Sequence, residues 1–450
     1  MEKRLLFDRL EEFGDQSAII WKNRDYSYHR LLSGISEWTE VLKQVEVAAG
    51  ECVAICGDFS PNATMLMLAL MKNGNIIVPL TPSMASKKEK CLKTACVKSL
   101  FEFDDSDTYR FKLLHNTDDH SLLQALRKTG DPGLIIFSSG STGEMKAALH
   151  NLQKLLSKYQ RKRRSFKTLA FLLFDHIGGI NTLLYSLFNG GTLVIMTGSD
   201  RTVELICETI EQYRVNLLPT TPTFIKMLAI SEMHKQYDLS SLQLITYGTE
   251  PMHPATLEFV TRIFPQVRFK QTYGLTETGI LPTKSMASES LGIKMGCEDC
   301  DIKVERGVLH VRSDTVMMGY LNASAPIDKD GWYNTGDIVE PMGDGYFRIL
   351  GRESEIINVA GEKVFPAEIE NVILKMNNIK DVTVQGLPNP VTGNVVVATV
   401  ELEEPEDADQ LERRVRDFCE QRLPPFMIPA VVEISSRRLY GERFKKTRRS

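Results

Sequence analysis

Helical segments and short apolar runs follow one another along most of this chain. Val203, Ile206 and Ile210 recur at helical spacing, and an apolar run over 215–218 follows that segment at once. Other apolar runs of strand length, each with glycine beside one boundary, cover 134–137, 192–196 and 242–247. Short buried strands that alternate with helices are typical of layered α/β folds. We therefore expect a large, layered α/β body.

The pattern changes near residue 351, where a short polar stretch precedes a second set of elements. This set comprises a helix around 369–376, strands at 382–387 and 395–402, a helix over 411–419 and an apolar run at 431–434. A chain of 450 residues is about three times the length of a typical domain, so more than one unit is expected. We predict a large domain over 1–350, a hinge over 351–354 and a small, mobile α+β domain over 355–450.

Composition excludes several classes of protein. Lys and Arg total 54 against 58 Asp and Glu, so no overall positive field marks a general nucleic-acid binder. The most apolar long stretch, 63–80, is interrupted by Lys72, Asn73 and Asn75, and we expect no membrane span. Eight scattered cysteines do not form a disulfide framework, and Cys297-x-x-Cys300 lacks a second pair, which favours a structural role over zinc binding or redox cycling. A cytoplasmic location fits best.

A loop rich in glycine and hydroxyl side chains directly follows the strand expected at 134–137. It reads Ser138-Ser139-Gly140-Ser141-Thr142-Gly143-Glu144-Met145-Lys146. Small residues let backbone amides approach phosphate oxygens, and the lysine adds a positive charge. The spacing differs from that of a Walker A loop. Binding of a nucleotide triphosphate is indicated, with an ordinary Gly/Ser turn as the alternative.

Further motifs resemble, in the same order, those of the adenylate-forming superfamily, which includes acyl- and aryl-CoA synthetases, luciferases and peptide-synthetase adenylation domains. After the phosphate loop come Gly248-Thr249-Glu250-Pro251, Gln271-Thr272-Tyr273-Gly274-Leu275-Thr276-Glu277-Thr278, Gly331-Trp332-Tyr333-Asn334-Thr335-Gly336-Asp337, Gly351-Arg352 and the segment 361–370. The appearance is closest to acyl- and aryl-CoA ligases. The resemblance implies a large AMP-binding domain closed by a small lid.

The resemblance also implies roles for individual residues. It assigns ATP or AMP binding to Ser138, Ser139, Gly140, Ser141, Thr142, Gly143, Gly248, Thr249, Glu250, Tyr273, Gly274, Asp337 and Arg352. It assigns catalysis to Lys146, Thr276 and Glu277, and Glu277 is also the expected Mg²⁺ ligand. His176, Gly178 and Gly179 resemble the border of the acid pocket, with a core histidine as the alternative. Gly361 and Lys363 resemble the loop that approaches CoA, and Ser354 the hinge position.

The end of the chain departs from the family pattern. An ungapped match places Glu442 where relatives carry a lysine that reaches the acid and the α-phosphate. Either Lys445 or Lys446 replaces that lysine, or the first half-reaction is slow or altered. A basic cluster also lies upstream, at Lys154, Lys158, Arg161, Lys162, Arg163, Arg164 and Lys167. This cluster is consistent with binding the phosphates of CoA or an acidic carrier protein, and equally with a solvated helix face.

The motifs together predict an ATP- and Mg²⁺-dependent ligase. It would convert an aryl or fatty carboxylic acid to its adenylate and pass the acyl group to a thiol, with CoA as the leading acceptor. One alternative acceptor is the phosphopantetheine of an acyl carrier protein. Another alternative, prompted by Glu442, is an impaired nucleotide-binding homologue.

Overall fold

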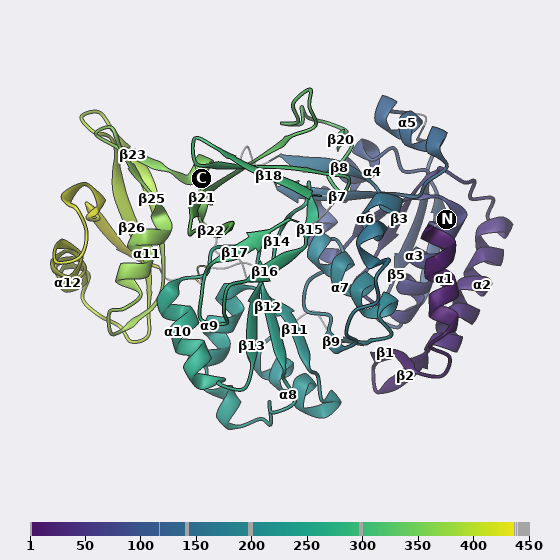
Figure 1. The fold of residues 1–450 in the computed structure, drawn as a ribbon, viewed down its shortest axis with the longest axis horizontal. Coiled ribbons are helices and arrows are strands. Elements are labelled where there is room, and N and C mark those ends of the chain that lie inside the picture. Colours follow the sequence, from purple (N-terminus) through teal and green to yellow (C-terminus); the bar gives the residue numbers. More distant parts are fainter. Residues whose placement is uncertain are drawn as a thin grey trace.

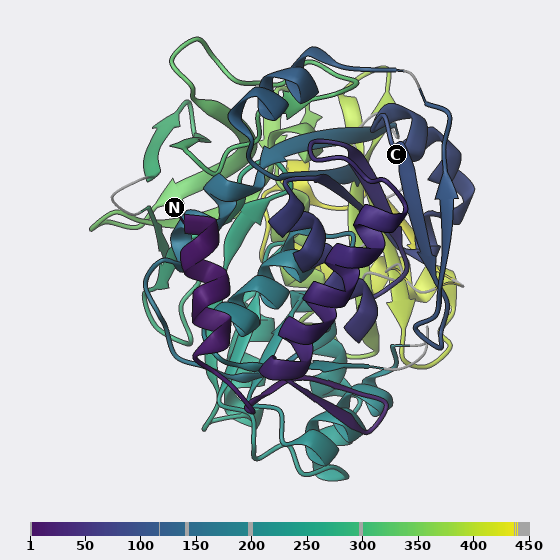
Figure 2. The same ribbon diagram turned by 90° about the vertical axis from the view of Figure 1, so that its right-hand side faces the viewer.

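The computed structural model describes residues 2–116, 118–139, 144–196, 201–296, 300–435, 437 and 439. Figure 1 shows a large body that holds most of the chain and a smaller unit, coloured green to yellow, at its side. The body carries its helices in the order α1 (Glu2–Glu11), α2 (Tyr28–Gln44), α3 (Pro61–Asn73), α4 (Lys88–Thr94), α5 (Ser121–Thr129), α6 (Leu152–Leu156), α7 (Ile177–Phe188), α8 (Val203–Tyr213), α9 (Pro222–Ile230) and α10 (Pro254–Ile263). Figure 2 shows α1 and α2 on the outer face of the body.

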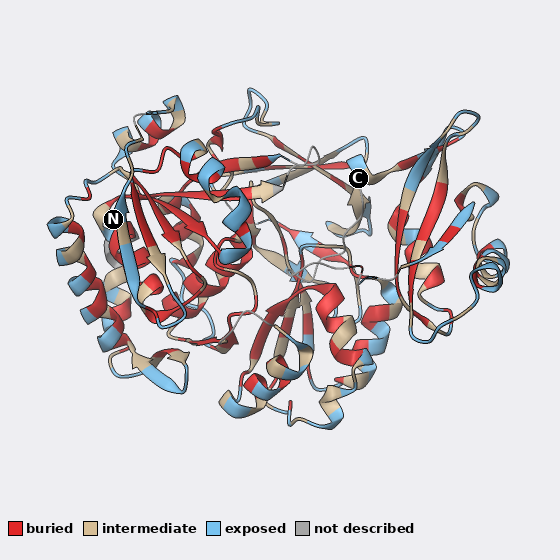
Figure 3. Ribbon diagram, turned by 180° about the vertical axis from the view of Figure 1, so that it is seen from behind, coloured by how far each residue is buried: buried red, intermediate tan, exposed pale blue. Residues whose placement is uncertain are grey.

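Two mixed sheets form the centre of the body. Within the described residues the first is seven-stranded, in the spatial order β20 (Gly319–Tyr320), β8 (Met145–Asn151), β7 (Gly133–Ser139), β4 (Ile76–Leu80), β3 (Cys52–Cys56), β5 (Ser99–Phe103) and β6 (Tyr109–Leu113). The second, also seven-stranded there, has the order β13 (Arg268–Gln271), β12 (Leu244–Tyr247), β11 (Leu217–Thr220), β9 (Lys167–Leu169), β10 (Thr192–Ile195), β1 (Ser17–Trp21) and β2 (Arg24–Ser27). Figure 3 shows buried residues concentrated along the strands of the body and on the helix faces that cover them.

A third, antiparallel sheet links the body to the small unit. Its order is β16 (Thr283–Ser285), β17 (Ile293–Met295), β22 (Tyr346–Arg352), β21 (Tyr333–Pro341), β19 (Val308–Ser313) and β18 (Cys300–Glu305). The hairpin of β14 (Tyr273–Leu275) and β15 (Gly279–Leu281) precedes it in the chain. Strand β22 ends at Arg352, so the small unit begins where this sheet stops.

The small unit has a hydrophobic core of its own, to which Ile357, Val384 and Leu411 belong. Its elements are β23 (Ile357–Val359), β24 (Glu362–Val364), α11 (Pro366–Ile373), β25 (Ile379–Asn389), β26 (Gly393–Leu402), α12 (Ala408–Glu420) and β27 (Val431–Ile434). The expected α+β pattern is therefore present, with α11 ending three residues before Met376. The hinge limits 351–354 stay a prediction.

Local sequence signals explain where several elements begin and end. Ser60 accepts a hydrogen bond from the amide of Ala63, Pro61 opens α3, and Gly74 ends it with a φ of +82°. The stretch 63–80 is thus a buried helix, a turn and a strand. Over the described residues, no helix is long and apolar enough to cross a membrane. Helix α8 contains the residues expected at helical spacing, whereas β11 begins at Leu217, two residues later than expected.

Candidate active site

A cavity of about 480 Å³ lies at the carboxyl ends of β11, β12 and β13. These strands are parallel neighbours, so the loops that leave them meet at one edge of the sheet. Ligands of open α/β sheets bind at such edges. Seven of the predicted nucleotide-binding residues line the cavity: Gly248, Thr249, Glu250, Tyr273, Gly274, Asp337 and Arg352. Three motifs and the expected hinge region, distant in sequence, therefore share one site.

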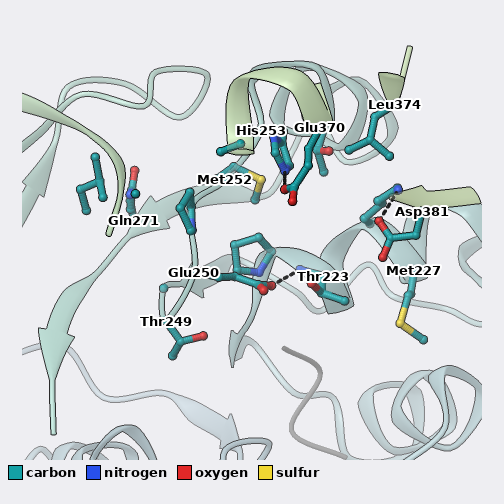
Figure 4. A pocket seen from close by; sticks show the side chains of 18 of the residues that line it. Thr223, Met227, Thr249, Glu250, Met252, His253, Gln271, Glu370, Leu374 and Asp381 are labelled. Carbon is teal, nitrogen blue, oxygen red and sulfur yellow. Dashed lines mark hydrogen bonds and ion pairs between the residues drawn. The ribbon is translucent and has the colours of Figure 1, made fainter. Parts of the chain in front are cut away.

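The loop after β12 forms one wall of this cavity. The carboxylate of Glu250 accepts a hydrogen bond from the backbone N–H of Thr223, at 2.7 Å, near the start of α9. Thr249 has a φ of +74°, a left-handed conformation that costs a non-glycine residue ~1–3 kcal/mol. A Cβ at Gly248 would lie 2.8 Å from the carbonyl oxygen of Thr272. The loop is therefore fixed in a close and strained approach to the neighbouring strand end. Figure 4 shows Thr249 and Glu250 of this loop, with Glu250 bonded to Thr223.

Asp337 is the centre of a buried polar cluster that also lines the cavity. Its Oδ2 accepts a hydrogen bond from the hydroxyl of Tyr273 at 2.5 Å, and its Oδ1 lies 2.7 Å from Nε of Arg352. Arg352 also donates to the carbonyl of Thr335 at 3.1 Å. Burial raises the pKa of Asp337, and Arg352 offsets part of that rise. A carboxylate can accept about four hydrogen bonds, so Asp337 retains capacity for ligand hydroxyls.

Glu277 and the strands that flank the phosphate loop meet around Tyr320. The Oε1 atom of Glu277 accepts from the Tyr320 hydroxyl at 2.6 Å and from Ser138 Oγ at 3.4 Å. The ammonium group of Lys146 lies 5.3 Å from the centre of the Tyr320 ring. Ser138, Lys146 and Glu277 are thus brought together. Sequence reasoning did not identify Tyr320, because this residue lies outside the recognised motifs.

A second residue that sequence reasoning missed, His150 on β8, holds the loop that carries Thr276. Its Nε2 lies 2.6 Å from the carbonyl oxygen of Thr276 and therefore donates to it. Burial lowers the pKa of this imidazole, which favours the neutral form. This hydrogen bond from His150 therefore fixes the backbone of Thr276.

Part of the predicted nucleotide-binding and catalytic set lies outside the described residues. These positions are Gly140, Ser141, Thr142 and Gly143 of the phosphate loop, and Lys445 and Lys446 near the chain end. Ser139 ends strand β7, where it pairs with Met145. Cys297 is also outside the described part, while Cys300 is a buried free thiol.

His176 caps the buried helix α7. Its Nδ1 accepts a hydrogen bond from the backbone N–H of Gly178 at 3.2 Å. The preceding Asp175 is buried and accepts from Thr81 Oγ1 at 2.7 Å. His176, Gly178 and Gly179 are not among the residues that line the cavity at the strand ends. Their assignment to an acid pocket stays a prediction.

Gly179→Ala is expected to destabilise the protein by ~3 kcal/mol, because the added atom overfills a packed site. Its Cβ would lie 2.0 Å from the carbonyl oxygen of Leu173, and a backbone atom cannot rotate away. The matched control is Gly178→Ala, whose Cβ would meet the terminal Cδ1 of Leu172 at 2.7 Å, a group that can turn. Urea unfolding followed by circular dichroism measures both. An equal loss in the two variants would contradict this packing argument.

The small unit contributes another wall of the cavity through two contacts that sequence reasoning missed. Lys226 on α9 donates to the carbonyl of Lys380 at 2.5 Å and lies 3.3 Å from the carboxylate of Asp381. His253 lies 3.6 Å from the fully buried Glu370. Figure 4 shows His253 and Glu370 facing each other, with Asp381 nearby. In each of the two contacts the paired residues lie more than a hundred positions apart in the sequence, so no local sequence pattern indicates the contact.

The hinge position Ser354 and the residues predicted for thiol access lie outside this cavity. Gly361, with a φ of +92°, occupies the turn between β23 and β24, and Lys363 is exposed on β24. Ser354 is exposed in a short helical turn over Glu353–Glu355. None of these three is among the lining residues of the cavity. The structure therefore does not bring the predicted thiol-access residues to the nucleotide site.

Comparison with known proteins identifies the family. The family model described as AMP-binding enzyme matches residues 6–321, and the one described as AMP-binding enzyme C-terminal domain matches residues 368–448. The chain therefore belongs to the AMP-binding enzyme family. The superfamily indicated by the ordered motifs is confirmed, as is the fold with a large α/β domain and a small C-terminal domain.

Individual relatives are moderately similar. An indoleacetate–CoA ligase of Aromatoleum aromaticum is 29% identical over an alignment covering 86% of this chain and 85% of that protein. A 4-coumarate:CoA ligase of Petunia hybrida is 28% identical over 70% of this chain and 63% of its own length. The structure of an anthranilate CoA ligase in complex with anthranoyl-AMP superposes with a TM-score of 0.84 at 20% identity, covering 98% of this chain and 95% of that one.

Proposed function

We propose that this protein activates a carboxylic acid with ATP and transfers the acyl group to a thiol, with coenzyme A as the acceptor. The observation that carries the proposal is the cavity at the strand ends, which gathers the Gly248 loop, Tyr273, Asp337 and Arg352. The named activities of the Aromatoleum and Petunia relatives support CoA as the acceptor.

The first step joins the acid to AMP. A carboxylate oxygen attacks the α-phosphorus, the bond from that phosphorus to the bridging oxygen breaks, and pyrophosphate leaves with the electron pair. Negative charge grows on the phosphate oxygens, so catalysis depends on positioning and on nearby donors and cations. Lys146, Ser138 and the hydroxyl-rich loop 139–143 are the groups proposed to supply them, together with Thr276.

The adenosine part of the nucleotide has a proposed position in the cavity. Tyr273 and the Gly248 loop would flank adenine, and Asp337 would accept hydrogen bonds from the ribose hydroxyls. Asp337 is already aligned by Tyr273 and Arg352. A carboxylate held from two sides loses little further freedom on binding, which favours affinity.

Magnesium would enter as part of the ATP substrate. Over the described residues no group of three or more His, Cys, Asp or Glu side chains could hold a metal ion. This fits Mg²⁺, which usually binds one or two carboxylates together with substrate phosphates and water. Glu277 is the proposed carboxylate, and the bound ion would neutralise phosphate charge.

In the second step the thiolate sulfur attacks the acyl carbon and AMP leaves. The proposed access loop, Gly361 with Lys363, is exposed and outside the cavity in this arrangement. We propose that rotation of the small unit near Ser354 brings this loop to the adenylate. Lys445 or Lys446 is the proposed substitute for the family lysine in the first step.

The test is acid-dependent exchange of labelled pyrophosphate into ATP by the full chain. We expect exchange with some members of a panel of aryl and fatty acids, followed by AMP release and thioester formation when CoA is added. Transfer to a purified holo-carrier protein without use of CoA would reassign the acceptor. ATP binding without exchange for any acid would overturn the ligase proposal.

A further inference from the structure

A second cavity, of about 410 Å³, lies between α7 and one face of the second sheet. Alternate residues of four neighbouring strands β9, β11, β12 and β13 line it: Thr168, Leu217, Pro219, Leu244, Thr246, Arg268 and Lys270. The register pairs Leu244 with Arg268 and Thr246 with Lys270, so these side chains form rows on one face. On the other side, Asn181, Thr182 and Tyr185 of α7 close the cavity. Its volume lies within the range of small-molecule sites.

The two cavities meet at Thr272, which lines both. This residue directly follows β13 and lies at the edge of the nucleotide cavity. The second cavity therefore extends from the nucleotide site along the strands, toward their amino ends. A molecule that reacts with the nucleotide at Thr272 would lie along β13, with its far end near Lys270 and Arg268.

Basic side chains predominate among the charged residues of the second cavity. Five of its lining residues are cationic: Lys158, Arg163, Arg164, Arg268 and Lys270. None of its described lining residues is Asp or Glu, and among the described residues no carboxylate forms an ion pair with any of the five. Clustered cations without an internal counter-charge attract anionic ligands.

Lys158 and Lys270 lie deepest among these cations. The ammonium group of Lys158 donates to Asn181 Oδ1 at 2.6 Å and to the carbonyl of Ile280 at 3.1 Å, both uncharged acceptors. Burial, with Arg163 adding repulsion, lowers the pKa of Lys158 to about 7, and burial also lowers that of Lys270. Arg163, Arg164 and Arg268 are exposed. Half-buried lysines held without a counter-ion would gain stability from a bound anion.

Apolar groups line the cavity beside the charged ones. Phe166, Leu217, Pro219 and Leu281 line the cavity, and the guanidinium of Arg164 lies 5.0 Å from the centre of the Phe166 ring. A hydrocarbon or aromatic segment can therefore pack against the walls. The cavity thus combines apolar walls with cationic groups, of which Lys270 and Arg268 lie on β13 away from its nucleotide end.

We infer that this cavity takes the acid substrate and that the acid carries a second anionic group at the end remote from the reacting carboxylate. The inference rests on the proposed ligase function. A strand rises about 3.3 Å per residue, which puts the Lys270 backbone ~7 Å and the Arg268 backbone ~13 Å from Thr272. The class expected is a dicarboxylic acid, aromatic or aliphatic, with its carboxylates separated by about that range.

The experiment compares matched acids in pyrophosphate exchange with the full chain. The pairs are 4-carboxycinnamate with 4-methylcinnamate and nonanedioate with decanoate. We expect a higher kcat/KM for the dicarboxylate of at least one pair. Lys270→Met should reduce the ratio of dicarboxylate to monocarboxylate kcat/KM by roughly 10- to 100-fold, as expected for loss of a charged contact. Lys284→Met, at an exposed lysine outside the cavity, is the control and should keep the ratio.

A second variant protects the test if Lys270→Met fails to fold. Arg268→Gln alters an exposed side chain and should lower the same ratio by a smaller factor. Equal or better use of monocarboxylates, with the ratio unmoved by both variants, would overturn the inference and leave the ligase proposal standing. A raised KM for CoA with an unchanged ratio would also overturn it, by assigning these cations to CoA phosphates. Absence of exchange with every acid would overturn both.

Discussion

Asp337→Ala is expected to lower kcat/KM for ATP in pyrophosphate exchange by about 100-fold, equivalent to ~3 kcal/mol. The Asp337 carboxylate is buried and is bonded to Tyr273 on one oxygen and Arg352 on the other. Its removal deletes the proposed ribose acceptor and leaves Arg352 without its carboxylate. Steady-state kinetics at saturating acid measures the effect, with KM for ATP expected to carry most of it.

Tyr273→Phe is the matched control for this cluster. It removes the hydroxyl that donates to Asp337 and keeps the ring proposed to contact adenine, so we expect a loss of about tenfold or less. Urea unfolding of both variants separates folding from binding. If folded Asp337→Ala kept the kcat/KM of the unaltered chain, the cluster would be structural and the proposed nucleotide position would be wrong.

The elements that follow strong local patterns were predictable. The helix expected from the spacing of Val203, Ile206 and Ile210 is present, and a Thr202 cap and a break at Arg214 set its bounds. The final strand, Val431–Ile434, also matches its apolar run. Strand β11 begins at Leu217 because pairing with Leu244 and Thr168, rather than local hydrophobicity, sets its limits. The order of strands in the sheets depends on such long-range pairing and was not predicted.

Residues of the site that belong to a sequence motif were predictable from the sequence, whereas residues that act through tertiary contacts were not. Gly248, Tyr273, Asp337 and Arg352 do line one cavity. Tyr320 and His150 position Glu277 and Thr276 through side-chain contacts from other strands, so no spacing identifies them. One interpretation of the basic cluster around Lys158 was a solvated helix face. Only the folded structure shows that Lys158 and Lys270 line the same cavity.

Glu277→Gln is expected to lower kcat for pyrophosphate exchange by roughly 100- to 1,000-fold, the range seen when one preorganised electrostatic group is lost. Glutamine keeps an oxygen that can accept from the Tyr320 hydroxyl, now 2.6 Å from the carboxylate, so the local packing should persist. The charge proposed to hold the metal of MgATP is lost. We therefore expect the Mg²⁺ concentration for half-maximal rate to rise, while AMP binding without Mg²⁺ changes little.

Tyr320→Phe distinguishes charge from positioning. It removes the donor to Glu277 but keeps the ring beside Lys146, and a loss of about tenfold or less is expected for one hydrogen bond. The two variants together isolate the metal role, because only Glu277→Gln should shift the Mg²⁺ dependence. If Glu277→Gln lost AMP binding without Mg²⁺ by the same factor as it loses kcat, Glu277 would act by holding the loop around Thr276. The metal assignment would then pass to another group.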